Sequence, residues 1–332
     1  MFKKGAMISR VSMLAATCLL VVTFLSSCVM ATASDFPTRP LKIIVPWSPG
    51  GATDTMARAL ASVAPDVMGQ PLIVVNKPGG AGVPGMAFGA KAKPDGYTLT
   101  AATSASLATP QYFREVPYSL DDFIPICQVY TTPIVLVVRA DSPWKTLQDF
   151  LDEAREKPGR ITYGHAGVGT TVHLVGEAIN LEAGVKLAQT PFGGSAPALA
   201  ALMGGHVDSA LVLASEVVGY VEGGELRVLG VAAKKRFPLL PDAPTFKEQE
   251  YPNILGFAYK GVVVPAGTPE DRVAYLRKAF AEMVKHPAFV KLFKKLKIPL
   301  DYLPGEECRQ SWEEVSNFYG DIIKRAGIKL KK

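Results

Sequence analysis

The chain has 332 residues, of which 48% are hydrophobic and 20% are charged. This length and composition suit two packed domains of ordinary size and argue against long disordered regions. The formal net charge is +6, and three of the positive charges lie in the first ten residues. The rest of the chain is therefore too weakly basic for nucleic-acid binding, but it suits a small anionic ligand.

The first 35 residues are typical of an export signal. Positive residues precede an apolar run at residues 11–25 that is too short to cross a membrane comfortably. Leu25-Ser26-Ser27-Cys28 resembles a lipobox, in which Cys28 would be acylated, whereas Ala31-Thr32-Ala33 resembles an ordinary cleavage site. We favour the lipobox because Cys28 directly ends the apolar run. Either site predicts a mature protein in the periplasm.

A strand, a turn and a helix are predicted between residues 41 and 58. Residues 41–45 are mostly apolar and end in β-branched side chains, as in a strand that is buried on both faces. Pro46 and Pro49 end the strand, because proline lacks the N–H that a neighbouring strand needs. Two glycines then allow the turn, and Thr53 is the predicted N-cap of the helix.

This turn is the first candidate anion site. A helix N-terminus at the carboxyl end of a strand presents backbone N–H groups to an anion without needing a charged side chain. Asp54 either suits the positive end of the helix dipole or meets the ammonium group of an amino-acid ligand. The alternative for the whole stretch is an ordinary tight turn in an α/β core.

The rest of the mature chain alternates strands and helices. Strands are predicted at residues 71–76, 97–102, 135–138, 160–163, 207–212, 227–231 and 259–264. Helices are predicted at residues 86–93, 146–155, from 172 on, and at 198–203, 270–284, 287–296 and 306–325. Strand–helix–strand order implies parallel pairing with right-handed crossovers.

Two later turns repeat the pattern of the first. Residues 164–171 and 192–197 are rich in glycine and hydroxyl side chains, and a predicted helix follows each. The strands at 135–138 and 259–264 lead into segments that read as crossings between two α/β lobes. Two crossings predict a clamshell in which glycine-rich helix N-termini from both lobes face one cleft and grip a small anion.

Several short motifs occur in order along nearly the whole mature chain, at residues 36–40, 45–54, 76–82, 94–99, 204–208, 237–245 and 265–269. Together they resemble the substrate-binding proteins of tripartite tricarboxylate transporters, the Bug or TctC family. The resemblance implies a two-lobe, Venus-flytrap fold of the type II periplasmic-binding-protein kind. In this α/β fold, helices flank two parallel or mixed sheets. It also implies a receptor without a cofactor and without catalytic activity.

The resemblance implies partners as well, whereas the segment boundaries below follow from the signal segment and the two crossings. The receptor would capture a small carboxylate between its lobes and deliver it to the large and small membrane subunits of the transporter. It would be monomeric and would not bind nucleic acid. The expected segments are a leader at 1–35, a first lobe at 36–139 and 262–332, and an inserted second lobe at 140–261.

Ligand-binding residues follow from the same resemblance. The first turn would hold one carboxylate through residues Ser48, Pro49, Gly50, Gly51, Ala52, Thr53 and Asp54. Ser104 would add a hydroxyl group from the first lobe. The second lobe would hold the other end through Gly169, Thr170, Thr171, His173, Gly194 and Ser195. His173 is either a ligand donor or a helix imidazole satisfied within the protein. Trp47 and Phe192 stand where other aromatic residues are commoner in the family, which affects the shape and polarity of the site.

A different hypothesis rests on Gly80-Ala81-Gly82-Val83-Pro84-Gly85, a literal G-x-G-x-x-G between a strand and a helix. It would make the chain an exported NAD-type enzyme. Against it, prolines bracket the turn, the helix is short, and no acidic residue ends the next strand. A sensor that feeds a signalling partner is a third hypothesis.

The motifs of common enzymes and metal sites are absent from the sequence. The sequence contains no G-x-S-x-G and no H-E-x-x-H motif, and His165 and His173 lack further ligands at metal-binding spacing. Cys127 and Cys308 either pair in the oxidising periplasm or remain free; we favour free, buried thiols.

Overall fold

The computed structural model describes residues 36–112 and 115–325. The predicted leader, with Cys28 and Ala33, lies outside this range. The chain from Pro37 onward is one unit of α/β type. Its described part is built on a ten-stranded mixed sheet in the order β2-β1-β3-β9-β4-β7-β5-β6, with β8 and β10 pairing with β4.

The first part of the sheet is parallel and carries the predicted turn. Strand β1 (Leu41–Val45) lies between β2 (Leu72–Asn76) and β3 (Thr98–Thr103). Helices α2 (Ala52–Met68) and α3 (Val83–Ala90) connect these strands. Apart from Lys42, all β1 side chains are buried. The mostly apolar run therefore became a central strand, as its composition predicts.

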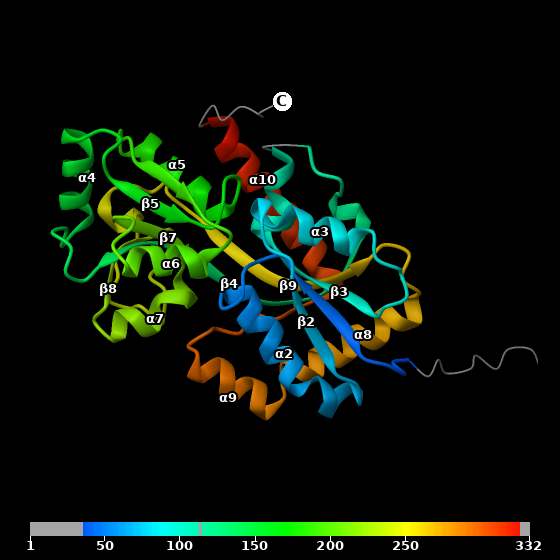
Figure 1. Ribbon diagram of the computed structural model, residues 1–332. Helices are drawn as coiled ribbons and strands as arrows, with labels where there is room; N and C mark the ends of the chain where they lie inside the picture. The colour runs from blue at the N-terminus through cyan, green and yellow to red at the C-terminus, as the bar shows by residue number, and fades with distance from the viewer. Residues whose placement is uncertain (1–35, 113–114, 326–332) are drawn as a thin grey trace, which may run out of the picture. The chain divides into compact units, whose positions relative to one another are not determined.

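Two long strands join this part of the sheet to the next (Figure 1). Strand β4 (Phe123–Arg139) pairs antiparallel with β9 (Phe257–Pro265) up to Pro133. From Ile134 onward, β4 pairs instead with β7 and β8. One continuous strand therefore belongs to both halves of the sheet.

The second half repeats the strand–turn–helix pattern. Strand β5 (Thr162–His165) lies parallel to β6 (Ala188–Pro191) and β7 (Ser209–Leu213), and β8 (Leu226–Val231) pairs with β4. Its helices are α4 (Leu147–Glu156), α5 (Thr171–Glu182), α6 (Ser195–Met203) and α7 (Ala214–Glu222).

The chain then returns to the first half. Helices α8 (Glu270–Met283) and α9 (Pro287–Lys295) pack against α2, and β10 (Leu303–Pro304) pairs with β4. Helix α10 (Gly305–Arg325), red in Figure 1, packs on β4. Its Trp312 stacks on Tyr259 of the neighbouring strand β9, with ring centroids 4.7 Å apart. The C-terminal helices thus complete the core beneath the two joining strands.

The structure corrects several element predictions. Thr53 is not the N-cap of α2, because the helix begins at Ala52 after Gly51, which caps it without a side chain. Strand β4 begins twelve residues before the predicted segment (Phe123 against residue 135). Strand β6 and helix α7 were not predicted. The short, partly polar run of β6 gives little apolar periodicity, and α7 follows β7 without a turn signal.

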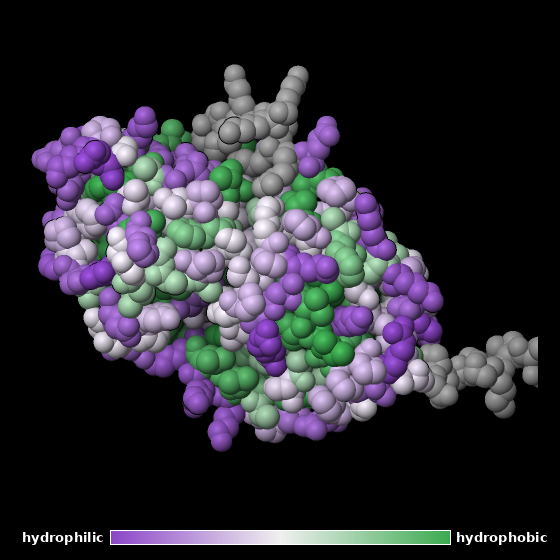
Figure 2. Space-filling view, in the orientation of Figure 1, coloured by the Kyte–Doolittle hydropathy of each residue, from purple (hydrophilic) through white to green (hydrophobic). Residues whose placement is uncertain are grey.

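Part of the surface is apolar. In Figure 2, apolar side chains gather near α3 and β2, and Phe88 of α3 and Ile73 of β2 are exposed. The Lys77 Nζ lies 4.4 Å from the Phe88 ring centroid, so a charged group covers part of this apolar surface. Within residues 36–112 and 115–325, no helix has the length and apolarity to cross a membrane.

Gly261 offers a test of the packing around β9. A Cβ atom at this position would lie 2.6 Å from both the Cys127 carbonyl oxygen and the Trp312 ring. We expect Gly261→Ala to lower the free energy of unfolding in urea by about 2 kcal/mol through overpacking. The matched control is Gly219→Ala in α7, where a Cβ meets no atom within 4 Å. A helical alanine should stabilise by about 0.5 kcal/mol there. Equal urea midpoints for the two variants would contradict the packing.

Candidate functional site

The predicted turns from the two halves meet around a small cavity. Its volume is about 30 Å³, which is room for water-sized groups only. A larger cavity of about 730 Å³ adjoins it and shares Gly51, Ala52 and Glu216 with it. The first half contributes Trp47, Ser48, Gly51, Ala52, Thr53 and Ala105. The second half contributes Ala166, Thr171, Val172, Gly194, Ser195, Leu213 and Glu216, and β9 contributes Ala258 and Lys260.

Three helices begin at this cavity. Ala52, Thr171 and Ser195 are the first residues of α2, α5 and α6, and all three line it. A helix N-terminus carries unsatisfied N–H groups and a partial positive charge. Three such ends from both halves make the cavity electrostatically suited to an anion.

Hydrogen bonds connect the two halves beside the cavity. Ser48 Oγ donates to the Gly193 carbonyl oxygen (3.1 Å), and Thr109 Oγ1 donates to the Gly169 carbonyl oxygen (2.5 Å). Gly194 packs so closely that a Cβ there would lie 3.5 Å from the Ser48 backbone nitrogen. Glycine at these positions therefore permits the close approach of the two turns.

Glu216 of α7 forms a third connection, which the sequence analysis missed. Its Oε1 accepts a hydrogen bond from Ala52 N (2.9 Å), and its Oε2 accepts one from Leu213 N (3.0 Å). A carboxylate of the protein itself thus sits at the N-terminus of α2, where an anion was predicted. The sequence signal for Glu216 is an acidic residue in the first turn of a helix. It could not be used because α7 itself was not predicted.

Lys260 is the second missed residue. It lies in β9 beside Thr103 of β3 and Tyr130 of β4, and only 5% of it is exposed. Burial lowers the pKa of its ammonium group to about 8, although the nearby Glu216 carboxylate opposes this shift. The signal in the sequence was a single lysine inside an otherwise apolar strand.

Asp54 is used within the first turn. Its carboxylate accepts hydrogen bonds from Gly50 N (3.0 Å), Arg58 Nε (2.8 Å) and Asn76 Nδ2 (2.9 Å). Burial tends to raise the pKa of Asp54, but these three donors outweigh it and hold the pKa below its ordinary value. Asn76 Nδ2 also donates to the Trp47 carbonyl oxygen (3.1 Å), so this network holds the turn in place.

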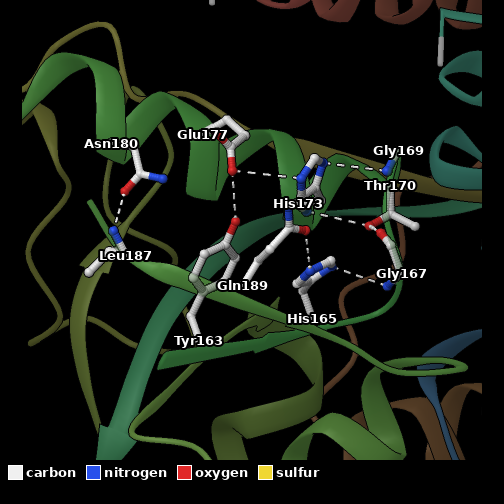
Figure 3. Close-up of polar contacts among 10 residues, drawn as sticks. All are labelled: Tyr163, His165, Gly167, Gly169, Thr170, His173, Glu177, Asn180, Leu187 and Gln189. Carbon is white, nitrogen blue, oxygen red and sulfur yellow. Dashed lines mark hydrogen bonds and ion pairs between the residues drawn. The ribbon is translucent and has the colours of Figure 1, made fainter. Parts of the chain in front are cut away.

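The second-half turn is held by its own polar groups (Figure 3). Thr170 Oγ1 donates to the Gly167 carbonyl oxygen (2.7 Å) and accepts from His173 N (3.4 Å), which caps α5. The Nδ1 atom of His173 accepts from Gly169 N (3.4 Å), and the Nδ1 atom of His165 accepts from Gly167 N (3.2 Å). These side chains hold the turn through hydrogen bonds to its backbone, and none of them lines the cavity.

His165 and His173 form a buried pair with ring centroids 5.1 Å apart. Burial lowers the pKa of His165 to about 4. Burial, together with repulsion from His165, lowers the pKa of His173 to about 3. Both rings are therefore neutral at neutral pH, which leaves each Nδ1 able to accept a backbone N–H.

Among the buried polar atoms without a hydrogen-bond partner in the described part of the chain, two belong to the first half and lie next to the cavity. They are Trp47 Nε1 and Ser104 Oγ; Ser215 Oγ and Tyr259 Oη also lack a partner and belong to residues next in sequence to lining residues. Trp47 lines the cavity, and Ser104 opens the short π-helix 104–108, whose next residue, Ala105, also lines it. Buried donors are normally satisfied, so these two atoms point to an acceptor that binds here.

The structure therefore divides the predicted site residues into two groups. Those that line the cavity are Ser48, Gly51, Ala52, Thr53, Thr171, Gly194 and Ser195. Those that do not are Pro49, Gly50, Asp54, Ser104, Gly169, Thr170 and His173. Phe192 is also absent from the lining; its ring lies beside Gly164 in the second half.

The glycines of the G-x-G-x-x-G motif have a packing role. A Cβ on Gly82 would lie 2.8 Å from the Ser106 Cβ, and one on Gly85 would lie 2.7 Å from Pro46. These glycines allow η1 (Gly80–Gly82) and α3 to pack against the first turn. The motif thus supports the cavity wall, and its packing accounts for the spacing of the glycines.

The structure also bears on the cysteines and on possible metal ligands. Cys127 and Cys308 are buried free thiols, as favoured from the sequence. Among the residues the structure describes, no three His, Cys, Asp or Glu side chains are grouped to hold a metal ion.

Comparisons with known proteins show the family of the chain. A family model described as "Tripartite tricarboxylate transporter family receptor" matches residues 56–328. Protein BugT of Bordetella pertussis is 31% identical over 304 residues, which cover 90% of this chain and 93% of BugT.

Two solved structures carry a ligand in their descriptions. MatC from Rhodopseudomonas palustris with bound malate has a TM-score of 0.80 at 28% identity, covering 87% of this chain and all of MatC. R. palustris Rpa4515 with adipate has a TM-score of 0.83 at 28% identity, covering 89% of this chain and all of Rpa4515. The chain therefore belongs to the receptor family of tripartite tricarboxylate transporters, the Bug or TctC family.

Proposed function

We propose that the protein is an extracytoplasmic receptor that captures a small carboxylate between its two halves. It delivers this ligand to the large and small membrane subunits of a tripartite tricarboxylate transporter and catalyses no reaction. The observation that carries the proposal is the convergence of helix N-termini from both halves on one cavity. Those of α5 and α6 come from the second half, and that of α2, whose first N–H is already bonded to Glu216, comes from the first. The solved relatives with malate and adipate support a carboxylate as the class of ligand.

Capture follows from the division of the fold. We infer a first lobe at residues 36–139 and 262–332 and a second lobe at 140–261, joined along β4 and β9. A ligand that contacts both lobes binds the closed state better than the open one, and this difference in affinity drives closure. The cavity of this structure is too small for a dicarboxylate, so we infer that the lobes lie further apart when the ligand enters and when it is bound.

The predicted site residues then have two roles. Ser48, Gly51, Ala52 and Thr53 from the first lobe, with Thr171, Gly194 and Ser195 from the second, form the walls of the site. Pro49, Gly50, Asp54, Gly169, Thr170 and His173 hold those walls in position, and Ser104 contributes its unpaired hydroxyl group. The receptor acts as a monomer in the periplasm. Cys28 is the candidate lipid attachment site, and the mass of the mature N-terminus distinguishes an anchored from a free protein.

A ligand panel tests the function. Purified protein is heated with malate, adipate, citrate, amino acids and aromatic acids, with sodium chloride at equal ionic strength as the control. We expect at least one carboxylate to stabilise the protein by about 3 kcal/mol when present at a hundredfold excess over its Kd. The absence of a shift with every carboxylate would overturn the proposed function.

A further inference from the structure

We propose that Lys260 is the charged side chain that binds the carboxylate of the ligand, and that its pairing with Glu216 selects mono- or dicarboxylates over tricarboxylates. This inference rests on the proposed function and deepens it. The cavity binds the carboxylate through a lysine on the strand that joins the lobes, in addition to the helix N-termini of the predicted turns.

The position of Lys260 is unusual for a lysine. It lies in the interior of β9, between β3 and β4, and is 95% buried, yet it lines the cavity. Lysines are almost never this buried unless they are paired or serve a function. A core role alone would be better served by an apolar side chain, because burying the ammonium group costs free energy.

The ammonium group is not held by a close ion pair. Among the described residues, the ion pairs of 4.0 Å or less do not include Lys260, and the Glu216 carboxylate acts on it through its charge. Glu216 is the other charged residue of the cavity wall, and each of its carboxylate oxygens already accepts one backbone N–H, from Ala52 and from Leu213. A buried cation that faces a cavity without a close ion pair is completed by an anionic ligand.

Neighbouring donors point to the same acceptor. Trp47 Nε1 and Ser104 Oγ are buried and unpaired, and Trp47 lines the cavity with Lys260. Ser104 directly follows Thr103, the residue paired with Lys260 across β3 and β9. An ammonium group, an indole N–H and a hydroxyl group together match the acceptor capacity of a carboxylate.

The charge balance sets the ligand class. The cavity wall carries one positive and one negative side chain, Lys260 and Glu216. One carboxylate of the ligand is therefore attracted by the positive charge of Lys260, and the N–H groups of a helix N-terminus can bind a second. A third carboxylate would be repelled by the negative charge of Glu216. The remaining wall is largely apolar, with Ala105, Ala166, Val172, Leu213 and Ala258. A short aliphatic or aromatic body fits that wall better than the hydroxylated, triply charged citrate.

Titration calorimetry of the full mature protein tests this assignment. The probes are hexanoate, malate, adipate and citrate, and the proteins are wild type, Lys260→Met and Lys42→Met. Methionine keeps the length of the side chain without its charge, and Lys42 is an exposed lysine of β1, so its loss changes the net charge equally.

We expect wild type and Lys42→Met to bind hexanoate, malate or adipate more tightly than citrate. Lys260→Met should weaken that binding by about thirtyfold or more, as when one partner of a buried charge pair is removed. Wild-type binding at pH 8 should also take up about half a proton, because a bound carboxylate raises the pKa of Lys260 above its value of about 8. This uptake appears as a dependence of the binding heat on the buffer and should vanish in Lys260→Met.

The outcomes separate the two proposals. If the wild type binds none of the probes or of the wider panel, the proposed function fails and this inference fails with it. If the wild type binds a carboxylate and Lys260→Met binds it equally, with the same proton uptake, the inference fails and the receptor function stands. Tighter binding of citrate than of adipate would overturn the assigned ligand class.

Discussion

Lowering the pH from 8 to 5 is expected to reduce the free energy of unfolding by about 4 kcal/mol, because two buried histidines stay neutral in the folded protein. His165 and His173 have pKa values of about 4 and about 3 when folded, against 6.5 for an ordinary histidine. The measurement is urea unfolding at a series of pH values, without ligand.

The sign follows from proton binding in the two states. Below pH 6.5 the unfolded chain protonates both imidazoles, whereas the folded chain does not until the pH falls to about 4 and about 3. The unfolded state therefore binds more protons in this window, and stability is lost as the pH falls. By about pH 8 neither state is protonated at these groups, and their contribution is constant above that pH.

A double variant isolates the pair from the carboxylates that also titrate in acid. In His165→Asn/His173→Asn, the asparagine oxygens stand near the two Nδ1 atoms and can accept from Gly167 N and Gly169 N. The acid loss between pH 6.5 and 5 should then largely disappear. The control is His206→Asn, at an exposed position in the same half. A double variant that loses stability as steeply as the wild type would show that the buried pair is not responsible.

Replacing Lys260 by methionine is expected to raise the free energy of unfolding by about 3 kcal/mol at pH 7, while it weakens ligand binding. The folded pKa of Lys260 is about 8, against 10.5 for an ordinary lysine, because burial disfavours the ammonium form. Methionine removes that cost and fills a similar volume. Thermal and urea unfolding without ligand measure the gain, with Lys42→Met as the control.

The pH dependence gives a second readout of the same group. Between pH 8 and 10.5 the unfolded wild type keeps the Lys260 proton and the folded protein loses it, so stability rises with pH across this window. Lys260→Met should lack this rise. If Lys260→Met is less stable than the wild type at pH 7, burial of the Lys260 ammonium group does not destabilise the folded protein, and this explanation is wrong. A gain in stability with a loss of binding is the pattern expected of a residue kept for function.

The local parts of the site were predictable from the sequence because local chemistry determines them. Residues 41–45 are a central strand, the Pro46 turn follows it, and the helix begins within two residues of the prediction. The glycine-rich turns of the second half precede α5 and α6 as expected. Proline, glycine and apolar periodicity act over a few residues, so a pattern in the sequence reports them directly.

The charged residues of the cavity were not predictable in the same way. Ala52 and Glu216 are hydrogen-bonded but lie 164 residues apart, and only the packing of the two halves brings them together. Lys260 was visible as a lysine in an apolar strand, but which cavity that strand crosses depends on the register between β9, β3 and β4. His173 was expected from the family resemblance, but its role in holding the turn depends on the Gly169 N–H, which only the folded turn directs at its Nδ1 atom.

We propose that the cavity binds a carboxylate through the negative charge of that group. The most direct measurement is titration calorimetry of the wild type with paired ligands, each acid with its own primary amide, such as adipate with adipamide and hexanoate with hexanamide. The amide keeps the shape of the acid and removes the negative charge. We predict that at least one acid binds and that its amide binds at least a hundredfold more weakly. Equal binding of an acid and its amide, or binding of amides alone, would contradict the account.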